Sequence, residues 1–101
     1  GVTIIVGNKK ITAISVSDLY RQVLIHLNDI GVLNNLKHHL PFATSRKRYL
    51  LSNKPIHPGG KDFVVPVEFQ GYYMEAHKDY KNAITHLNKL LKLCELSLKY
   101  S

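Results

Sequence analysis

The feature of this sequence with the clearest chemical consequence is positive charge without nearby carboxylates. Between Asp29 and Asp62 the chain contains no acidic residue. Soluble proteins usually offset basic residues with neighbouring carboxylates, because a field of one sign destabilises the compact state. We therefore expect a negatively charged partner to approach this stretch. Its cations are Lys37, Arg46, Lys47, Arg48, Lys54 and Lys61, and His38, His39 and His57 lie beside them.

The run from Thr44 to Tyr49 combines two hydroxyls, three consecutive cations and an aromatic ring. Arginine side chains bind phosphate oxygens in a bidentate manner, hydroxyls add short donors, and a tyrosine can stack on a base. These residue types indicate nucleic-acid binding, and we expect the nucleic acid to be DNA. The predicted phosphate contacts are Arg46, Lys47, Arg48, Lys54 and Lys61, with Lys78 and Lys81 adjacent in space; the predicted base contacts are Tyr49, His57 and one of Tyr72 and Tyr73.

A second interpretation of the same run needs no ligand. In an extended strand, neighbouring side chains alternate between faces. Arg48 would then face solvent at the entrance of a strand while Tyr49 packs in the core. If the run instead contacts phosphates, the same alternation predicts that Arg46 and Arg48 share one binding surface while Lys47 faces away. An anionic protein or lipid is a further partner that this charge would suit.

Composition sets the limits on the kind of protein. The 101 residues carry a net charge of +7, include one cysteine, and start at Gly1. A chain of this length forms one domain, 1–101, which we expect to be an accessory domain cut from a longer protein. A single cysteine excludes an internal disulfide framework. No stretch has the 18 or so apolar residues of a membrane span. No signal peptide is recognisable, so we expect a cytoplasmic or otherwise intracellular protein.

The elements are predicted from turn signals and hydrophobic periodicity. Gly7-Asn8 joins two β-prone runs into a hairpin, and Ser15 begins an amphipathic helix that ends before Gly31. Pro66 limits the run 63–69 to an edge strand or a bulged one. A second amphipathic helix spans about 78–98. The expected fold is α+β, a small two-layer sandwich of a mainly antiparallel sheet and two amphipathic helices, in the order β-β-α-β-β-β-α.

The same sequence also allows other functions. The leucine-rich last helix allows a protein–protein interaction or oligomerisation domain, formed with a second copy or with other domains of the parent protein, because Leu93 and Leu96 lie partly off its apolar stripe. Asp62, Glu68 and Gln70 weakly resemble the metal-binding pattern of nucleases. Glu75, His77 and Asp79 are expected to be cap and surface groups at a strand–helix junction. No residue pattern indicates a catalytic group, a metal site or a cofactor, so any chemistry is expected in the rest of the parent protein.

Overall fold

In a computed structural model, which describes residues 1–100, the N-terminal strands form the predicted hairpin. β1 (Val2–Val6) and β2 (Lys9–Ala13) pair antiparallel, with Ile4 opposite Ile11. Gly7 lies between them with a φ of 61°, a conformation that costs glycine little because it has no Cβ.

The first helix also begins and ends where the sequence predicts. α1 (Val16–Asp29) is capped by the Ser15 side chain, which accepts a hydrogen bond from the Asp18 backbone N–H. Gly31 ends it in the left-handed conformation, with a φ of 79°. The Val32 N–H reaches back to the Leu27 carbonyl, as in a Schellman motif. A 3-10 helix, η1 (Leu33–His39), follows where no regular element was expected.

The second sheet contains four antiparallel strands, in the order β3 (Phe42–Ser45), β4 (Arg48–Ser52), β6 (Tyr72–Glu75) and β5 (Pro66–Phe69). The edge strand β5 carries Pro66 at its first position, which confirms the edge placement expected from a residue without a backbone N–H.

The last helix is shorter than its apolar stripe predicts. α2 (Tyr80–Lys92) begins at the Asp79 cap, and the chain leaves it at Glu95, whose φ is 56°. The Leu96 N–H donates to the Leu91 carbonyl and closes the helix end. The following residues form β7 (Leu98–Tyr100), which pairs with β1 and completes a sheet in the order β2-β1-β7. The prediction of a helix to residue 98 was therefore wrong.

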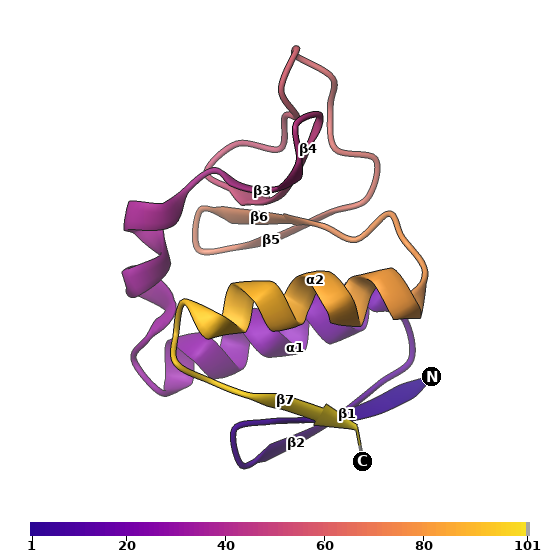
Figure 1. The fold of residues 1–101 in the computed structure, drawn as a ribbon, viewed down its shortest axis with the longest axis vertical. Coiled ribbons are helices and arrows are strands. Elements are labelled where there is room, and N and C mark those ends of the chain that lie inside the picture. Colours follow the sequence, from indigo (N-terminus) through magenta and orange to yellow (C-terminus); the bar gives the residue numbers. More distant parts are fainter. Residues whose placement is uncertain (101) are drawn as a thin grey trace.

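The α+β class, the antiparallel pairing and the two amphipathic helices are confirmed. The layers differ from the simple sandwich, because the strands divide into two sheets and the helices lie between them (Figure 1). Polar contacts join α1 to both: Gln22 donates to the Thr12 carbonyl in β2, and Arg21 to the Glu68 carbonyl in β5. With the 3-10 helix and two further strands, the observed order is β-β-α-η-β-β-β-β-α-β.

The core fills the space between these layers. Both helices bury wide faces: Leu19, Tyr20, Val23, Leu24 and Leu27 from α1, and Ala83, Ile84, Leu87, Leu90 and Leu91 from α2. Tyr20 extends from one helix to the other, and its buried hydroxyl donates to the Ala83 carbonyl. None of the helices in residues 1–100 is long and apolar enough to cross a bilayer.

Candidate nucleic-acid interface

The long connection between β4 and β5 is folded by its own hydrogen bonds. The His57 N–H donates to the Lys61 carbonyl at 2.7 Å, and the Phe63 N–H donates to the Pro55 carbonyl at 2.7 Å. Ile56 and Asp62 form an isolated antiparallel bridge. This segment rises above the four-stranded sheet at the top of Figure 1. Lys54 and Lys61 are therefore carried by a structured loop.

A buried histidine–carboxylate pair fastens this loop to the sheet. The His57 Nε2 lies 3.0 Å from the Glu75 Oε2, and the residues are 3 % and 4 % exposed. The Tyr49 backbone N–H donates to the His57 Nδ1 at 3.1 Å. Nδ1 is therefore the acceptor, Nε2 carries the ring proton, and a neutral His57 donates to the carboxylate.

Glu75 also accepts hydrogen bonds from the backbone just before β5 and just after β6. Its Oε2 accepts from the Val64 N–H and its Oε1 from the Val65 N–H, both at 2.8 Å. The His77 N–H is 3.3 Å from Oε1. Burial alone would raise the pKa of this carboxyl, but the hydrogen bonds from the backbone and from His57 outweigh it and lower the pKa below its ordinary value. Glu75 is thus an ionised group whose oxygens are occupied by protein donors.

Two adjoining hollows open on the surface above this pair. The inner hollow has a volume of about 210 Å³ and the outer hollow about 480 Å³. They share Arg48 and His57 in their walls. The inner hollow is lined by Thr44, Arg48, Tyr49, His57, Glu75, His77, Lys78, Asn82 and His86, and the outer hollow by Lys47, Arg48, His57, Pro58, Gly59 and Lys61.

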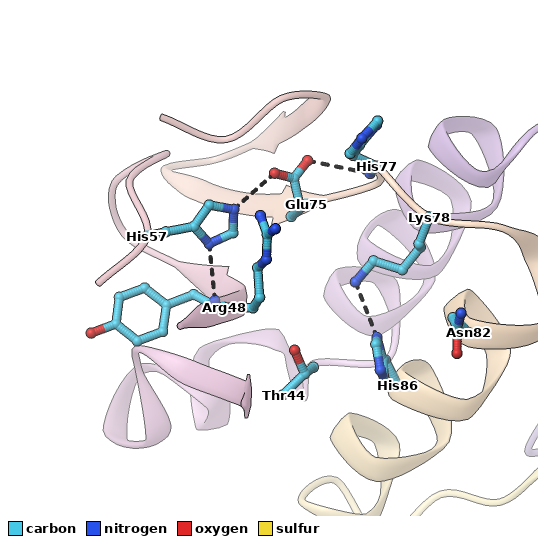
Figure 2. A pocket seen from close by; sticks show the side chains of 9 residues that line it. Thr44, Arg48, His57, Glu75, His77, Lys78, Asn82 and His86 are labelled. Atoms are coloured by element: carbon cyan, nitrogen blue, oxygen red, sulfur yellow. Dashed lines mark hydrogen bonds and ion pairs between the residues drawn. The ribbon is translucent and has the colours of Figure 1, made fainter. Parts of the chain in front are cut away.

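Figure 2 shows the inner hollow between the sheet and α2. The side chains of Arg48 and Lys78 extend toward it from opposite sides, and Thr44 and His86 lie along its other edge. The Lys78 Nζ is 3.2 Å from the His86 Nδ1. Four cations from three separate stretches of sequence, Lys47 and Arg48, Lys61, and Lys78, thus line two hollows that meet.

The other predicted contacts lie outside these walls. Arg46, Lys54 and Lys81 are exposed but line neither hollow. Lys37 lines a separate depression with Asn53 and Gln70. The basic stretch of sequence is therefore divided in space, and Lys78 joins it from a distant part of the chain.

The local geometry of the three consecutive cations differs from the extended run. Ser45 pairs with Arg48, so Arg46 and Lys47 form the turn between β3 and β4. Lys47 and Arg48 line the same hollow, and Lys47 does not face away from the arginines' surface as strand alternation predicts. The alternation prediction was wrong because it requires a continuous strand and the chain reverses direction here.

The aromatic candidates separate as their alternation predicts. Tyr72 is buried, and its hydroxyl donates to the Leu33 carbonyl, whereas Tyr73 is partly exposed. Tyr49 is partly buried in the wall of the inner hollow. Both ring nitrogens of His57 have partners within the protein, so this residue positions the loop and has no free nitrogen for a base edge.

Several residues of this site were missed or misread in the sequence. The sequence marks Thr44 only as the start of the basic run, and no sequence signal marks His86 as part of a site. Asp79 is the predicted helix cap, whereas Glu75 is buried and does not belong among the surface groups of that junction. No local signal marks the contact of Glu75 with His57, eighteen residues away along the chain.

The described residues do not assemble a site for either alternative function, the metal-dependent nuclease or the interaction helix. In the described part of the chain, residues 1–100, no three His, Cys, Asp or Glu side chains are placed to hold a metal ion. The leucines of α2 are buried within this chain, and Leu93 and Leu96 pack against the same core. Cys94 is partly buried beside them, and burial raises the pKa of its thiol.

Searches of protein-family models, of curated sequences and of solved structures found no match to this chain.

Proposed function

We propose that this domain binds nucleic acid, and DNA in particular, through the surface formed by the β3–β4 turn, the β4–β5 loop and the start of α2. The observation that carries this proposal is the meeting of Lys47, Arg48, Lys61 and Lys78 around two adjoining hollows. Among the described residues, Glu75 is the one acidic residue that lines these hollows. It is buried and already accepts hydrogen bonds from four protein donors. A phosphate backbone supplies the missing negative charge.

The arrangement suits a strand that passes over the turn and the loop. Arg46 and Lys47 project from a hairpin turn, and Lys54 and Lys61 flank the loop, so these cations can follow successive phosphates. Such contacts fix the position of a nucleic acid without reading its sequence. Tyr49 and the partly exposed Tyr73 are the rings available for stacking on a base.

Salt dependence tests the electrostatic part of the proposal. About five neutralised phosphates on duplex DNA predict a slope near −4.5 for log affinity against log salt, from about −0.9 per contact. A fluorescence-anisotropy titration of a labelled duplex at four salt concentrations measures this slope. An affinity that does not change with salt would refute the proposal.

Matched cation variants test the location of the surface. We expect Arg46→Ala with Arg48→Ala to weaken binding at least about tenfold, equivalent to about 1.4 kcal/mol. Lys37→Ala is the control, because it removes a cation of the same basic stretch that lines a separate depression. Circular dichroism establishes that each variant is folded. Equal affinity of the folded double variant and the wild type would place the binding surface elsewhere.

A further inference from the structure

Within residues 1–100, Lys78 is a basic side chain with no direct carboxylate partner. It is partly buried, its Nζ lies 5.8 Å from the centre of the Tyr20 ring, and its hydrogen-bond partner is the His86 Nδ1 at 3.2 Å. Among residues 1–100 no carboxylate oxygen lies within 4.0 Å of the Lys78 Nζ, and the Glu75 carboxylate contacts His57 instead. Desolvated charges in proteins are normally paired. A ligand anion in the inner hollow would supply the partner.

The charged groups around Lys78 explain why it stays unpaired. Its pKa is lowered to about 8: burial lowers it most, Glu75 from β6 acts in the opposite direction, and Arg48 from β4 adds to the lowering. The oxygens of Glu75 are held by backbone donors and His57. The Asp79 carboxylate caps α2 by accepting from the Asn82 N–H. Both nearby acids are therefore already engaged.

The remaining walls present further donors. Thr44 brings a hydroxyl from β3, Asn82 an amide from α2, and His77 an imidazole from the link before α2. His86 has a pKa lowered by burial and by Lys78 and Lys89, so it is neutral near pH 7 and its Nδ1 accepts from Lys78. The inner hollow thus combines two basic side chains, Arg48 and Lys78, with hydroxyl, amide and imidazole groups from separate elements.

Size and charge select the ligand. Pockets for drug-sized molecules are about 300–1,000 Å³, and the inner hollow is smaller, at about 210 Å³. A phosphate monoester carries about −1.5 to −2 charges at pH 7 and has three free oxygens. A phosphodiester within a strand carries one charge and brings a sugar on each side. We propose that the inner hollow binds the terminal phosphate monoester of a nucleic-acid strand.

This inference rests on the proposed function, because the rest of the strand would lie over the outer hollow and the β3–β4 turn. The two hollows meet at Arg48, which lines both. A terminal phosphate beside Lys78 would therefore be continuous with phosphates beside Lys47 and Lys61. The domain would then prefer strand ends to the interior of a duplex.

Oligonucleotides that differ only at their ends test the inference. Short strands and duplexes of one sequence are prepared with a 5′-phosphate, with a 3′-phosphate, or with hydroxyls at both ends, and compete against one labelled duplex. A charge-assisted hydrogen bond contributes enough to expect about tenfold tighter binding of one phosphorylated form. Equal affinities for all three forms would overturn the inference and leave the proposed function standing. Failure of every form to bind would overturn both.

Variants of Lys78 show whether the preference arises in the inner hollow. Lys78→Gln should abolish the preference for the phosphorylated end, and Lys78→Arg should retain most of it. Lys81→Gln is the matched control: this lysine is exposed on the first turn of α2 and lines neither hollow. Its loss should weaken all forms alike and leave their ratio unchanged. A preference that survives in the folded Lys78→Gln variant would overturn the assignment.

The pH profile supplies a second readout. Lys78 loses its charge as pH rises through about 8, so the preference should fall above that pH in the wild type. Bound phosphate favours the charged form and moves the fall to higher pH. A preference that is unchanged up to pH 10 would contradict the role of Lys78.

Discussion

Glu75→Gln is the most informative single change for testing how the β4–β5 loop is held against the four-stranded sheet. The substitution keeps the size of the side chain and replaces one carboxylate oxygen with an NH2 group. Each oxygen of Glu75 accepts from two donors: Oε2 from Val64 and His57, and Oε1 from Val65 and His77. In either orientation of the glutamine, two donors therefore face another donor.

The expected cost follows from the two hydrogen bonds whose donors lose their acceptor. An unsatisfied buried donor costs about 1–3 kcal/mol, and the backbone bonds here are only partly buried, so we expect a loss of about 2–4 kcal/mol. This is a large share of the roughly 5–15 kcal/mol that stabilises a small domain. Urea denaturation at pH 7, followed by circular dichroism, measures the change in the free energy of unfolding.

Glu68→Gln is the matched control on the neighbouring strand. Its side chain is exposed and accepts one hydrogen bond, from the Gly71 N–H. Exposed substitutions of this kind usually change stability by less than about 0.5 kcal/mol. If Glu75→Gln were equally mild, the histidine–carboxylate pair would not hold the loop, and the reasoning would be refuted.

Acid titration checks the same pair independently. The pKa of Glu75 is lowered from its ordinary value of 4.5, so the folded state releases this proton more readily than the unfolded chain. Its contribution to stability is therefore present above pH 4.5 and is lost as pH falls below that value through the folded pKa. Glu75→Gln removes the titrating group, so the variant should lose less stability than the wild type over that interval.

Two further predictions concern the helices. Leu87→Ala should destabilise the protein by about 2–5 kcal/mol because the side chain is fully buried, whereas Lys92→Ala should change little; denaturation curves of equal midpoint would place Leu87 outside the core. Lys78→Met should raise stability at pH 7, because burial lowers the pKa of Lys78 from 10.5 to about 8 and the folded state therefore opposes its charged form. The wild type should accordingly gain stability as pH rises from about 8 to 10.5, and the methionine variant should lack that gain in urea titrations across this range.

The sequence predicts the elements whose ends are determined locally. Ser15 and Gly31 enclose α1 through bonds to residues a few positions away, and Gly7 supplies the hairpin turn. The end of α2 was missed because Glu95, not glycine, takes the left-handed conformation. Leu98 continues the apolar stripe of the helix, and its place in β7 depends on pairing with Val6, more than ninety residues earlier.

The division into two sheets could not be predicted from local patterns, although the adjacent buried residues in each helix are consistent with it. In α1 the buried residues occur as adjacent pairs, Leu19 with Tyr20 and Val23 with Leu24. Adjacent helical positions point about 100° apart, so such pairs form a face wider than one sheet covers. Ile30 follows Leu27 at helical spacing but is 45 % exposed, because it is the C-cap residue beyond the last turn.

The candidate site was predicted only where its residues are close together in the sequence. Consecutive cations are visible in a sequence, and Lys47, Arg48 and Lys61 do line one hollow. Lys78 was expected to be adjacent in space, and it lines the neighbouring hollow with Arg48. The pairing of His57 with Glu75 could not be predicted, because it depends on how the loop returns to the sheet.

The placement of Glu75 meets two requirements of a cationic surface: the loop must be held in place, and its lysines must stay free of carboxylates. A loop that presents lysines must be held in place, and carboxylates that bind those lysines directly would cancel the field that attracts an anion. Glu75 instead lies beneath the surface and binds the Val64 and Val65 backbone and the neutral His57. It thus fixes the loop without pairing with Arg48 or Lys78. The missing acidic residues between 29 and 62 and the buried acid at 75 are two parts of one arrangement, in which cations stay available because the fold is secured by hydrogen bonds to the backbone.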